Sequence, residues 1–150
     1  MVQRPPLSLK GRALRLLSGR EHSRAELERK LAQHEEEPGQ LRRVLDDLHA
    51  KGFIDDQRAA DSVVHRRAAK LGAMRIRQEL QGKGLADELV RAAVAGLQAT
   101  EFERAREVWQ RKFGGPAADA AARAKQVRFL ASRGFGAEAI RQVLKRPRHE

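Results

Sequence analysis

Hydrophobic residues recur along the chain at the three- and four-residue spacing of amphipathic helices. Leu41, Leu45 and Leu48 illustrate this spacing, which places an apolar stripe along one side of a helix. Alternation of polar and apolar residues, the mark of a half-buried strand, does not persist beyond a few positions. The pattern therefore predicts an all-α protein.

Local signals indicate where several helices begin and end. Ser23 followed three residues later by Glu26 is a capping box, which favours a helix start. Asp55 and Asp56 precede another apolar-periodic segment and are placed to cap its first turn. A basic residue followed by glycine suits the end of a helix.

The apolar positions also recur over a longer period of about fifty residues, as expected for units that stack in one dimension. Three sets of positions share this period: Leu31, Leu80 and Leu130; Leu41, Val90 and Ile140; Leu45, Val94 and Leu144. Lys83-Gly84 and Arg133-Gly134 fall in the same register, whereas the first set has His34-Glu35 there.

The period divides the chain into three tandem units of three helices, each resembling a helix-turn-helix bundle. The predicted units are residues 8–56, 57–97 and 98–146. Such units would share little core, so we expect an elongated, curved molecule.

Composition excludes several functional classes. The 150 residues contain no cysteine, which excludes disulfide scaffolds, thiol nucleophiles and thiolate metal sites. The five histidines lack metal-ligand spacing, and the chain has no glycine-rich phosphate loop. The paired carboxylates at Asp46-Asp47 and Asp55-Asp56 are better interpreted as helix caps or solvated charge than as a catalytic pair. We therefore expect a protein that is not an enzyme and that has no cofactor and no metal.

The sequence also bears on location. No apolar run approaches the ~20 residues that cross a bilayer, and residues 1–6 lack the apolar stretch of a signal peptide. We therefore expect a soluble, cytoplasmic protein without a membrane partner.

Positive charge is concentrated in the second and third predicted units. The chain has 31 lysines and arginines against 20 acidic residues, a net charge of +11. Residues 8–56 are neutral, residues 57–97 carry +4 and residues 98–146 carry +6. Such a bias favours a polyanionic partner, bound in a salt-sensitive way through phosphates. The alternative interpretation is an ordinary solvated surface.

We expect the binding cations to gather on one concave side of the bent molecule. The candidates are Arg66, Arg67, Lys70, Arg75, Arg77 and Lys83 of the second unit, and Arg123, Lys125, Arg128 and Arg133 of the third.

Reading of base sequence is not predicted. The segment 86–94, which would face a DNA groove, offers one arginine and two acidic residues and no asparagine or glutamine. Stacking platforms for single strands are scarce as well, because the aromatic residues mostly occupy helical core positions. These residues are Phe53, Phe102, Trp109, Phe113, Phe129 and Phe135.

The middle of the chain carries a distinctive series of motifs. Gly52-Phe53-Ile54-Asp55-Asp56 is followed by a helix ending in Arg66-Arg67, by the Gly72-to-Ile76 turn, and by Leu80-Gln81-Gly82-Lys83-Gly84-Leu85. This series resembles the RecX family of bacterial regulatory proteins, and the likeness extends over nearly the whole chain. Ala59 and Val63 depart from the family pattern, which has aromatic residues at these packing positions.

The resemblance implies three three-helix repeats in a curved molecule that modulates RecA, the recombinase that polymerises on single-stranded DNA. It implies binding to RecA and to the RecA–DNA filament, with inhibition of ATP hydrolysis and strand exchange during DNA repair and recombination. The ten cations listed above would contact RecA or DNA phosphates, and Asp55 or Asp56 could instead pair with a basic side chain of RecA. We expect the protein to act as a monomer.

Two alternatives remain at the level of sequence. One is a helical protein that coats single- or double-stranded DNA without RecA and without sequence preference. The other is a scaffold whose positive charge serves only its solubility.

Overall fold

The computed structural model describes residues 6–145, and within them it is helical without strands. The helices are α1 (Leu9–Gly19), α2 (Arg24–Leu31), the short 3-10 helix η1 (Ala32–His34), α3 (Gln40–Ala50), α4 (Asp56–Arg67), α5 (Ala73–Gly82), α6 (Asp87–Gln98), α7 (Glu101–Phe113), α8 (Ala120–Ser132) and α9 (Ala137–Leu144). The all-α prediction is confirmed. Arg146, the last residue of the third predicted unit, lies outside the described residues.

Capping side chains define several helix starts. The Ser23 hydroxyl accepts a hydrogen bond from the Glu26 amide at 3.1 Å, and the Glu26 carboxylate accepts one from the Ser23 amide at 3.0 Å, so the predicted capping box is present. Asp55 caps α4 through the Arg58 amide at 3.1 Å. Asp119 caps α8 through the Ala122 amide at 2.8 Å. The helix boundaries thus follow from local sequence chemistry.

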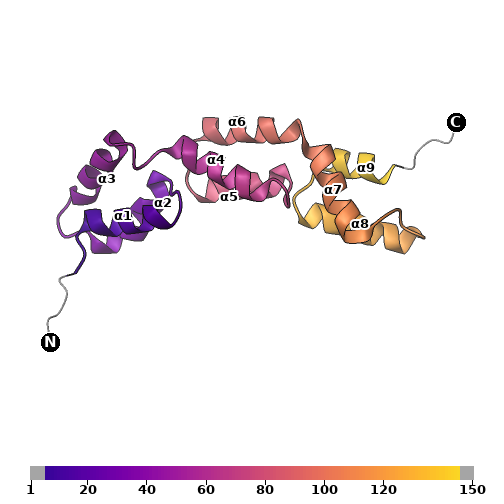
Figure 1. The fold of residues 1–150 in the computed structure, drawn as a ribbon, viewed down its shortest axis with the longest axis horizontal. Coiled ribbons are helices and arrows are strands. Elements are labelled where there is room, and N and C mark those ends of the chain that lie inside the picture. Colours follow the sequence, from indigo (N-terminus) through magenta and orange to yellow (C-terminus); the bar gives the residue numbers. More distant parts are fainter. Residues whose placement is uncertain (1–5, 146–150) are drawn as a thin grey trace.

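Three separate hydrophobic cores follow one another along the chain. The first is formed by α1–α3 around Leu27 and Leu45, and the second by α4–α6 around Ile76 and Leu80. The third is formed by α7–α9 around Leu130 and its neighbours. The three-helix units lie in an elongated, gently curved row, as predicted (Figure 1). Bundles of roughly 40–60 residues are only marginally stable alone, so contacts between the units matter for stability.

The aromatic residues are less buried than the sequence suggests. Trp109 and Phe135 are core residues, 8% and 2% exposed. Phe53 and Phe102 are 48% and 37% exposed, so their assignment to the core is wrong. Phe53 follows the end of α3 and Phe102 is the second residue of α7, where the helix ends lack a full set of packing neighbours.

Candidate polyanion interface

The first and second units meet at a contact that we call the first joint. Here the start of α2 packs against the turn that follows α5 (Figure 1). The Ser23 hydroxyl donates to the Lys83 carbonyl at 2.5 Å, and the Arg29 guanidinium donates to the Gly82 carbonyl at 2.7 Å. The Asp56 carboxylate of α4 accepts from the Arg24 amide at 3.0 Å. Backbone groups that the helix ends leave unpaired are thereby satisfied by the neighbouring unit.

The second and third units meet at the second joint, where the start of α5 packs against the turn that follows α8. The Gly72 amide donates to the Arg133 carbonyl at 2.8 Å. The Arg75 guanidinium donates to the Ser132 carbonyl at 2.7 Å. The Glu101 carboxylate of α7 accepts from the Ala73 amide at 2.8 Å.

The two joints share one design. In each, the first amide of a unit's second helix donates to a carboxylate at the first position of the next unit's first helix. In each, an arginine donates to the carbonyl just before the basic residue and glycine of the turn. The turns Lys83-Gly84 and Arg133-Gly134 are therefore docking elements. The first unit has His34-Glu35 in the corresponding register.

Partly buried ion pairs reinforce the first joint. The Glu26 carboxylate forms ion pairs with the Arg20 guanidinium at 2.7 Å and with the Lys83 ammonium at 3.4 Å. Burial opposes ionisation of this carboxyl group, but the hydrogen bonds from Arg20 and the Ser23 amide and the charges of Lys83 and Arg20 prevail. Together they lower the pKa of Glu26 from 4.5 to about 2.

Lys83 is consequently an internal residue of the joint. Its side chain is 16% exposed and bound to Glu26, so the expectation that it lies on an open basic surface is wrong. No local sequence signal points to this contact, because Glu26 is 57 residues away along the chain.

Two further predicted cations are engaged at one carboxylate. The Arg67 guanidinium lies 3.0 Å from Glu79, and that of Arg66 lies 4.0 Å from the same side chain. Both arginine side chains remain nearly half exposed. They can still bind a polyanion, which must then compete with Glu79 for the two guanidinium groups.

The ten predicted cations do not share one face. Residues two apart on a helix point in nearly opposite directions, about 160° apart. This separates Arg75 from Arg77 on α5, and Arg123 from Lys125 on α8. Lys125 and Arg128 are three apart and lie together on the exposed side of α8.

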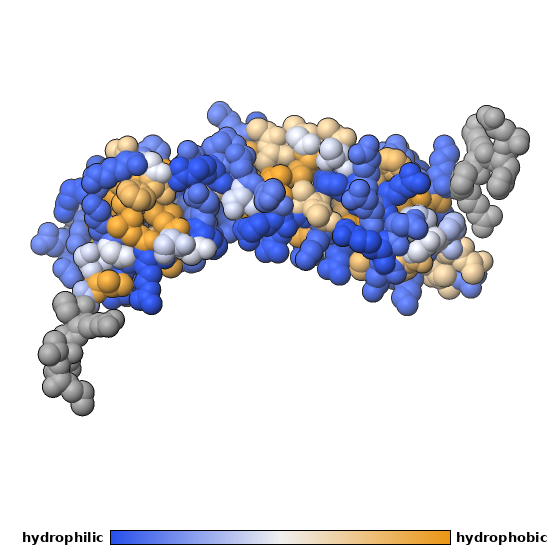
Figure 2. Space-filling model, in the orientation of Figure 1, coloured by the Kyte–Doolittle hydropathy of each residue, from blue (hydrophilic) through white to orange (hydrophobic). Residues whose placement is uncertain are grey.

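Four cations gather across the second joint, and we call them the junction cluster. They are Lys70, Arg111, Lys112 and Arg133, which line a cavity of about 500 Å³ together with Phe129. The Lys112 ammonium lies 5.4 Å, and the Arg133 guanidinium 4.9 Å, from the centre of the Phe129 ring. These four positive charges come from two units, and none has an ion-pair partner within the described residues. Hydrophilic residues cover much of the face drawn in Figure 2.

Arg111 and Lys112 are not among the cations predicted from sequence, and neither is Arg104, the arginine that positions them. Arg104 is seven residues before Arg111, two helical turns away on the same side of α7. Its guanidinium donates to the carbonyls of Ala68, Leu71 and Leu97 at 2.7–3.0 Å. Burial lowers the pKa of Arg104, which is held by backbone oxygens of the second unit. The seven-residue spacing of Arg104 and Arg111, which places both on one side of a helix, is visible in the sequence.

Arg111 continues this attachment. Its guanidinium donates to the Ala69 carbonyl at 2.9 Å, so the same side of α7 that fixes the joint also presents the junction cluster. The four cations are thus brought together only when the second and third units are docked in this way.

The first unit has a cationic surface that its neutral total charge conceals. A cavity of about 610 Å³ is lined by Arg12, Arg15, Arg20 and Lys30, with His22 and His34, and by no carboxylate. Burial lowers the pKa of His22, and the nearby charges of Arg20 and Lys30 act in the same direction. The acidic residues of this unit lie elsewhere, so a net charge per unit was a poor guide.

Asp55 and Asp56 have defined structural partners. Asp55 caps α4, and Asp56 accepts from the Arg24 amide across the first joint. Both are half-buried. These contacts account for the pair without a metal or a catalytic role.

The described residues contain no cluster of three or more histidine, cysteine or acidic side chains suited to a metal ion. In the same part of the chain, no helix has the length and apolar character needed to cross a membrane. The features that stand out in this part of the chain are the two joints between units and the cationic surfaces.

Comparison with known proteins gives a consistent result. Models of the RecX family match three parts of the chain: the first three-helix domain at residues 10–48, the second at 55–94 and the third at 99–144. "Regulatory protein RecX" of Leptothrix cholodnii is 56% identical over 147 residues, covering 98% of this chain and 94% of the relative. The protein of that name from Ralstonia nicotianae is 49% identical over 143 residues, covering 95% and 90%. The crystal structure of RecX from Lactobacillus salivarius shares the fold, with 21% identity, a TM-score of 0.74 and coverage of 91% and 92%.

Proposed function

Because the chain belongs to the RecX family of regulatory proteins, we propose that it binds RecA and the RecA–single-stranded DNA filament and inhibits RecA. It acts as a monomer in the cytoplasm, without catalysis of its own. Its role is to limit RecA-driven ATP hydrolysis and strand exchange in DNA repair and recombination.

The junction cluster is the observation that supports this proposal most strongly. Four cations without ion-pair partners in the described chain lie together where two units meet. A nucleoprotein filament presents phosphates along a helical path, and neutralising each phosphate releases counterions. An elongated body with cations on several units can make many weak contacts that add up through their linkage.

Among the ten predicted cations, those with free head groups are the best candidates for contact. Lys70, Arg77, Lys125, Arg128 and Arg133 form no ion pair within residues 6–145. Arg66, Arg67, Arg75 and Arg123 can contribute from their exposed positions while they retain internal bonds. Lys83 serves the first joint.

The direct test is RecA-catalysed, DNA-dependent ATP hydrolysis with this protein added below the RecA concentration. We expect inhibition at substoichiometric ratios, because one elongated molecule contacts several sites on the filament. Unchanged hydrolysis at equimolar protein would contradict the proposal.

A charge-reversal pair tests the assigned surface. Lys70→Glu combined with Arg133→Glu removes two members of the junction cluster, and we expect inhibition to weaken about ten-fold or more. The control is Arg42→Glu with Arg43→Glu on the exposed part of α3, which changes net charge equally. Equal losses in both variants would mean that total charge, and not this surface, sets the activity.

DNA titration separates the RecA proposal from binding to DNA alone. Labelled single-stranded DNA is titrated at physiological salt with and without RecA. Tight binding without RecA, together with unaffected ATP hydrolysis, would instead identify a stand-alone DNA-binding protein.

A further inference from the structure

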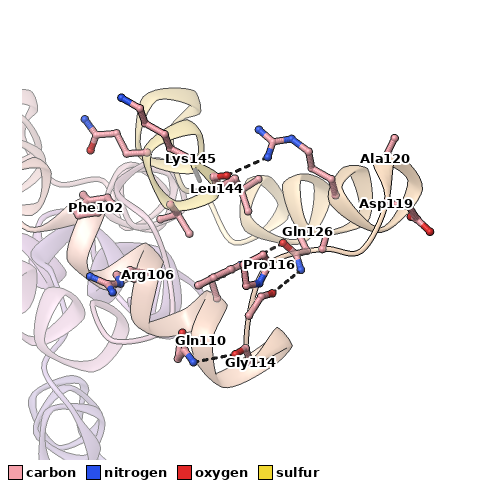
Figure 3. Close-up of a pocket in the computed structure, with 16 residues that line it drawn as sticks. Phe102, Arg106, Gln110, Gly114, Pro116, Asp119, Ala120, Gln126, Leu144 and Lys145 are labelled. Atoms are coloured by element: carbon pink, nitrogen blue, oxygen red, sulfur yellow. Dashed lines mark hydrogen bonds between the residues drawn. The ribbon is translucent and has the colours of Figure 1, made fainter. Parts of the chain in front are cut away.

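The third unit contains a cavity of about 710 Å³ that the junction cluster does not use. It is bounded by α7, the loop from Gly114 to Asp119, the start of α8 and the end of α9 (Figure 3). It lies on the other side of α7 from the junction cluster: Arg106 lines this cavity, and Arg111, five residues later, is rotated by about 140°.

The inner wall of this third-unit cavity is apolar and held in place by hydrogen bonds. Trp109 and Leu144 are each 8% exposed and contribute apolar surface. The Trp109 indole donates to the Gln126 side-chain oxygen at 2.9 Å, and the Gln126 amide donates to the Gly115 carbonyl at 3.2 Å. Gln126 is itself 5% exposed, so the loop is fastened to the core from inside. Phe102 lies at the mouth, 37% exposed.

Positive charge surrounds this apolar surface. Arg106, Arg123 and Lys145 line the cavity, against the single carboxylate of Asp119. The Asp119 carboxylate is already committed to the Ala122 amide. Arg123 donates to the Leu144 carbonyl at 3.1 Å, which ties its guanidinium to the end of α9. The cavity therefore combines an apolar interior with an excess of two positive charges.

Within residues 6–145, a longer second helix and the loop before it distinguish the third unit from the other two. Helix α5 begins seven residues before Leu80, whereas α8 begins ten residues before the equivalent Leu130. The additional turn of α8 and the Gly114-Gly115-Pro116 loop form one wall of the cavity. In the first two units, the start of the second helix is instead used for docking the next unit.

We propose that the third-unit cavity binds an acidic peptide segment of a partner protein, with one large apolar side chain inserted against Trp109 and Leu144. Carboxylates flanking that side chain pair with Arg106, Arg123 and Lys145. A peptide of this composition matches both the apolar interior and the charged rim.

Charge and burial argue against two other occupants of the cavity, a nucleic acid and the last five residues of this chain. A nucleic acid would offer phosphates to the rim, but its bases stack on exposed aromatic faces. The Trp109 ring is only 8% exposed, which leaves a base the partly exposed Phe102 ring alone among the residues that line the cavity. The last five residues of this chain contain two arginines and one glutamate, so the rim does not attract them.

The chain's single tryptophan makes the test direct, because Trp109 lies in the cavity wall. The probe is a synthetic peptide with one phenylalanine between two runs of three acidic residues, added to the full chain without RecA or DNA. A saturable change in tryptophan emission is expected. A peptide with serine in place of phenylalanine keeps the charge and should bind at least about ten-fold more weakly, since the apolar contact is lost.

The variant pair Arg106→Glu and Lys145→Glu should weaken the phenylalanine peptide about ten-fold or more. The matched control, Arg42→Glu with Arg43→Glu, reverses two charges on the exposed part of α3, away from the cavity, and should leave affinity within about two-fold. Absence of an emission change, or equal loss in both pairs, would overturn the proposal.

An oligothymidine arm completes the test. If oligothymidine displaces the peptide and loses this ability in Arg106→Glu with Lys145→Glu, the cavity is a nucleic-acid site and the peptide proposal is wrong. No RecA is present in these measurements, so their failure is independent of the ATP hydrolysis result.

Discussion

The two joints have the same geometry but different chemistry. The first joint is rich in charge: Glu26 meets Arg20 and Lys83, and the Arg58 guanidinium lies 3.0 Å from Glu21. The second joint relies on direct backbone contact, since Gly72 and Met74 donate to the carbonyls of Arg133 and Gly134. One docking geometry is therefore supported by ion pairs in one place and by close approach of backbones in the other.

The difference predicts different sensitivities. Close backbone contact has no room for a side chain, so the second joint should respond sharply to added atoms. Ion pairs depend on protonation and on salt, so the first joint should respond to solution conditions. Substitutions in each joint test this contrast.

The largest effect is expected for Gly72→Ala. A Cβ atom at this position would lie 2.3–2.4 Å from backbone atoms of Gly134 and Phe135, and backbone cannot move aside cheaply. We expect a loss of about 2–3 kcal/mol in stability. Hydrogen exchange of the Met74 amide, which donates across the joint, would report the local loosening, and thermal unfolding the global effect.

Gly82→Ala is the matched control, because a Cβ at this helical position meets nothing within 4 Å. It should stabilise the protein by about 0.5–1 kcal/mol, the ordinary gain of alanine over glycine in a helix. Similar behaviour of the two variants would contradict the close-contact account of the second joint.

A smaller loss, about 1–2 kcal/mol, is expected for Glu26→Gln in the first joint. The substitution leaves Arg20 and Lys83 facing a neutral side chain in a partly buried place. Urea denaturation would measure it. Glu28→Gln, which removes an exposed ion pair with Arg24, should change stability by less than about 0.5 kcal/mol.

Acid should weaken the first joint through the same carboxylate. The pKa of Glu26 is about 2 in the folded protein and 4.5 without its partners. Its stabilising contribution is therefore complete above pH 4.5 and decreases as the pH falls from 4.5 towards 2. The stability difference between the parent protein and Glu26→Gln should narrow across this window, and a constant difference would assign the stabilisation to another group.

Local features of the fold were accessible from sequence. The capping box at Ser23 and the period linking Leu31, Leu80 and Leu130 were read correctly, because capping and amphipathic packing involve residues close together in the chain. The matching positions of Lys83-Gly84 and Arg133-Gly134 were also visible, but their docking role was not. Their partners lie in the preceding unit, and nothing local identifies them.

The candidate site was harder to predict for the same reason. Prediction of the binding cations from sequence included Lys83, which is used inside a joint, and left out Arg111 and Lys112, which face Lys70 only after two units meet. It also missed the cationic cavity of the first unit, where opposite charges cancel in the total but not in space. Net charge indicates the class of partner. It does not show which cations lie together, because that depends on how the units dock at the joints.

Inhibition of RecA ATP hydrolysis by Gly72→Ala, measured beside Gly82→Ala, tests the central claim that the joints make the three units act as one regulator. We expect that Gly82→Ala inhibits as the parent protein does, and that Gly72→Ala needs several-fold more protein because its junction cluster is no longer held together. Full inhibition by Gly72→Ala, in a sample whose Met74 amide has lost its protection from exchange, would contradict that claim.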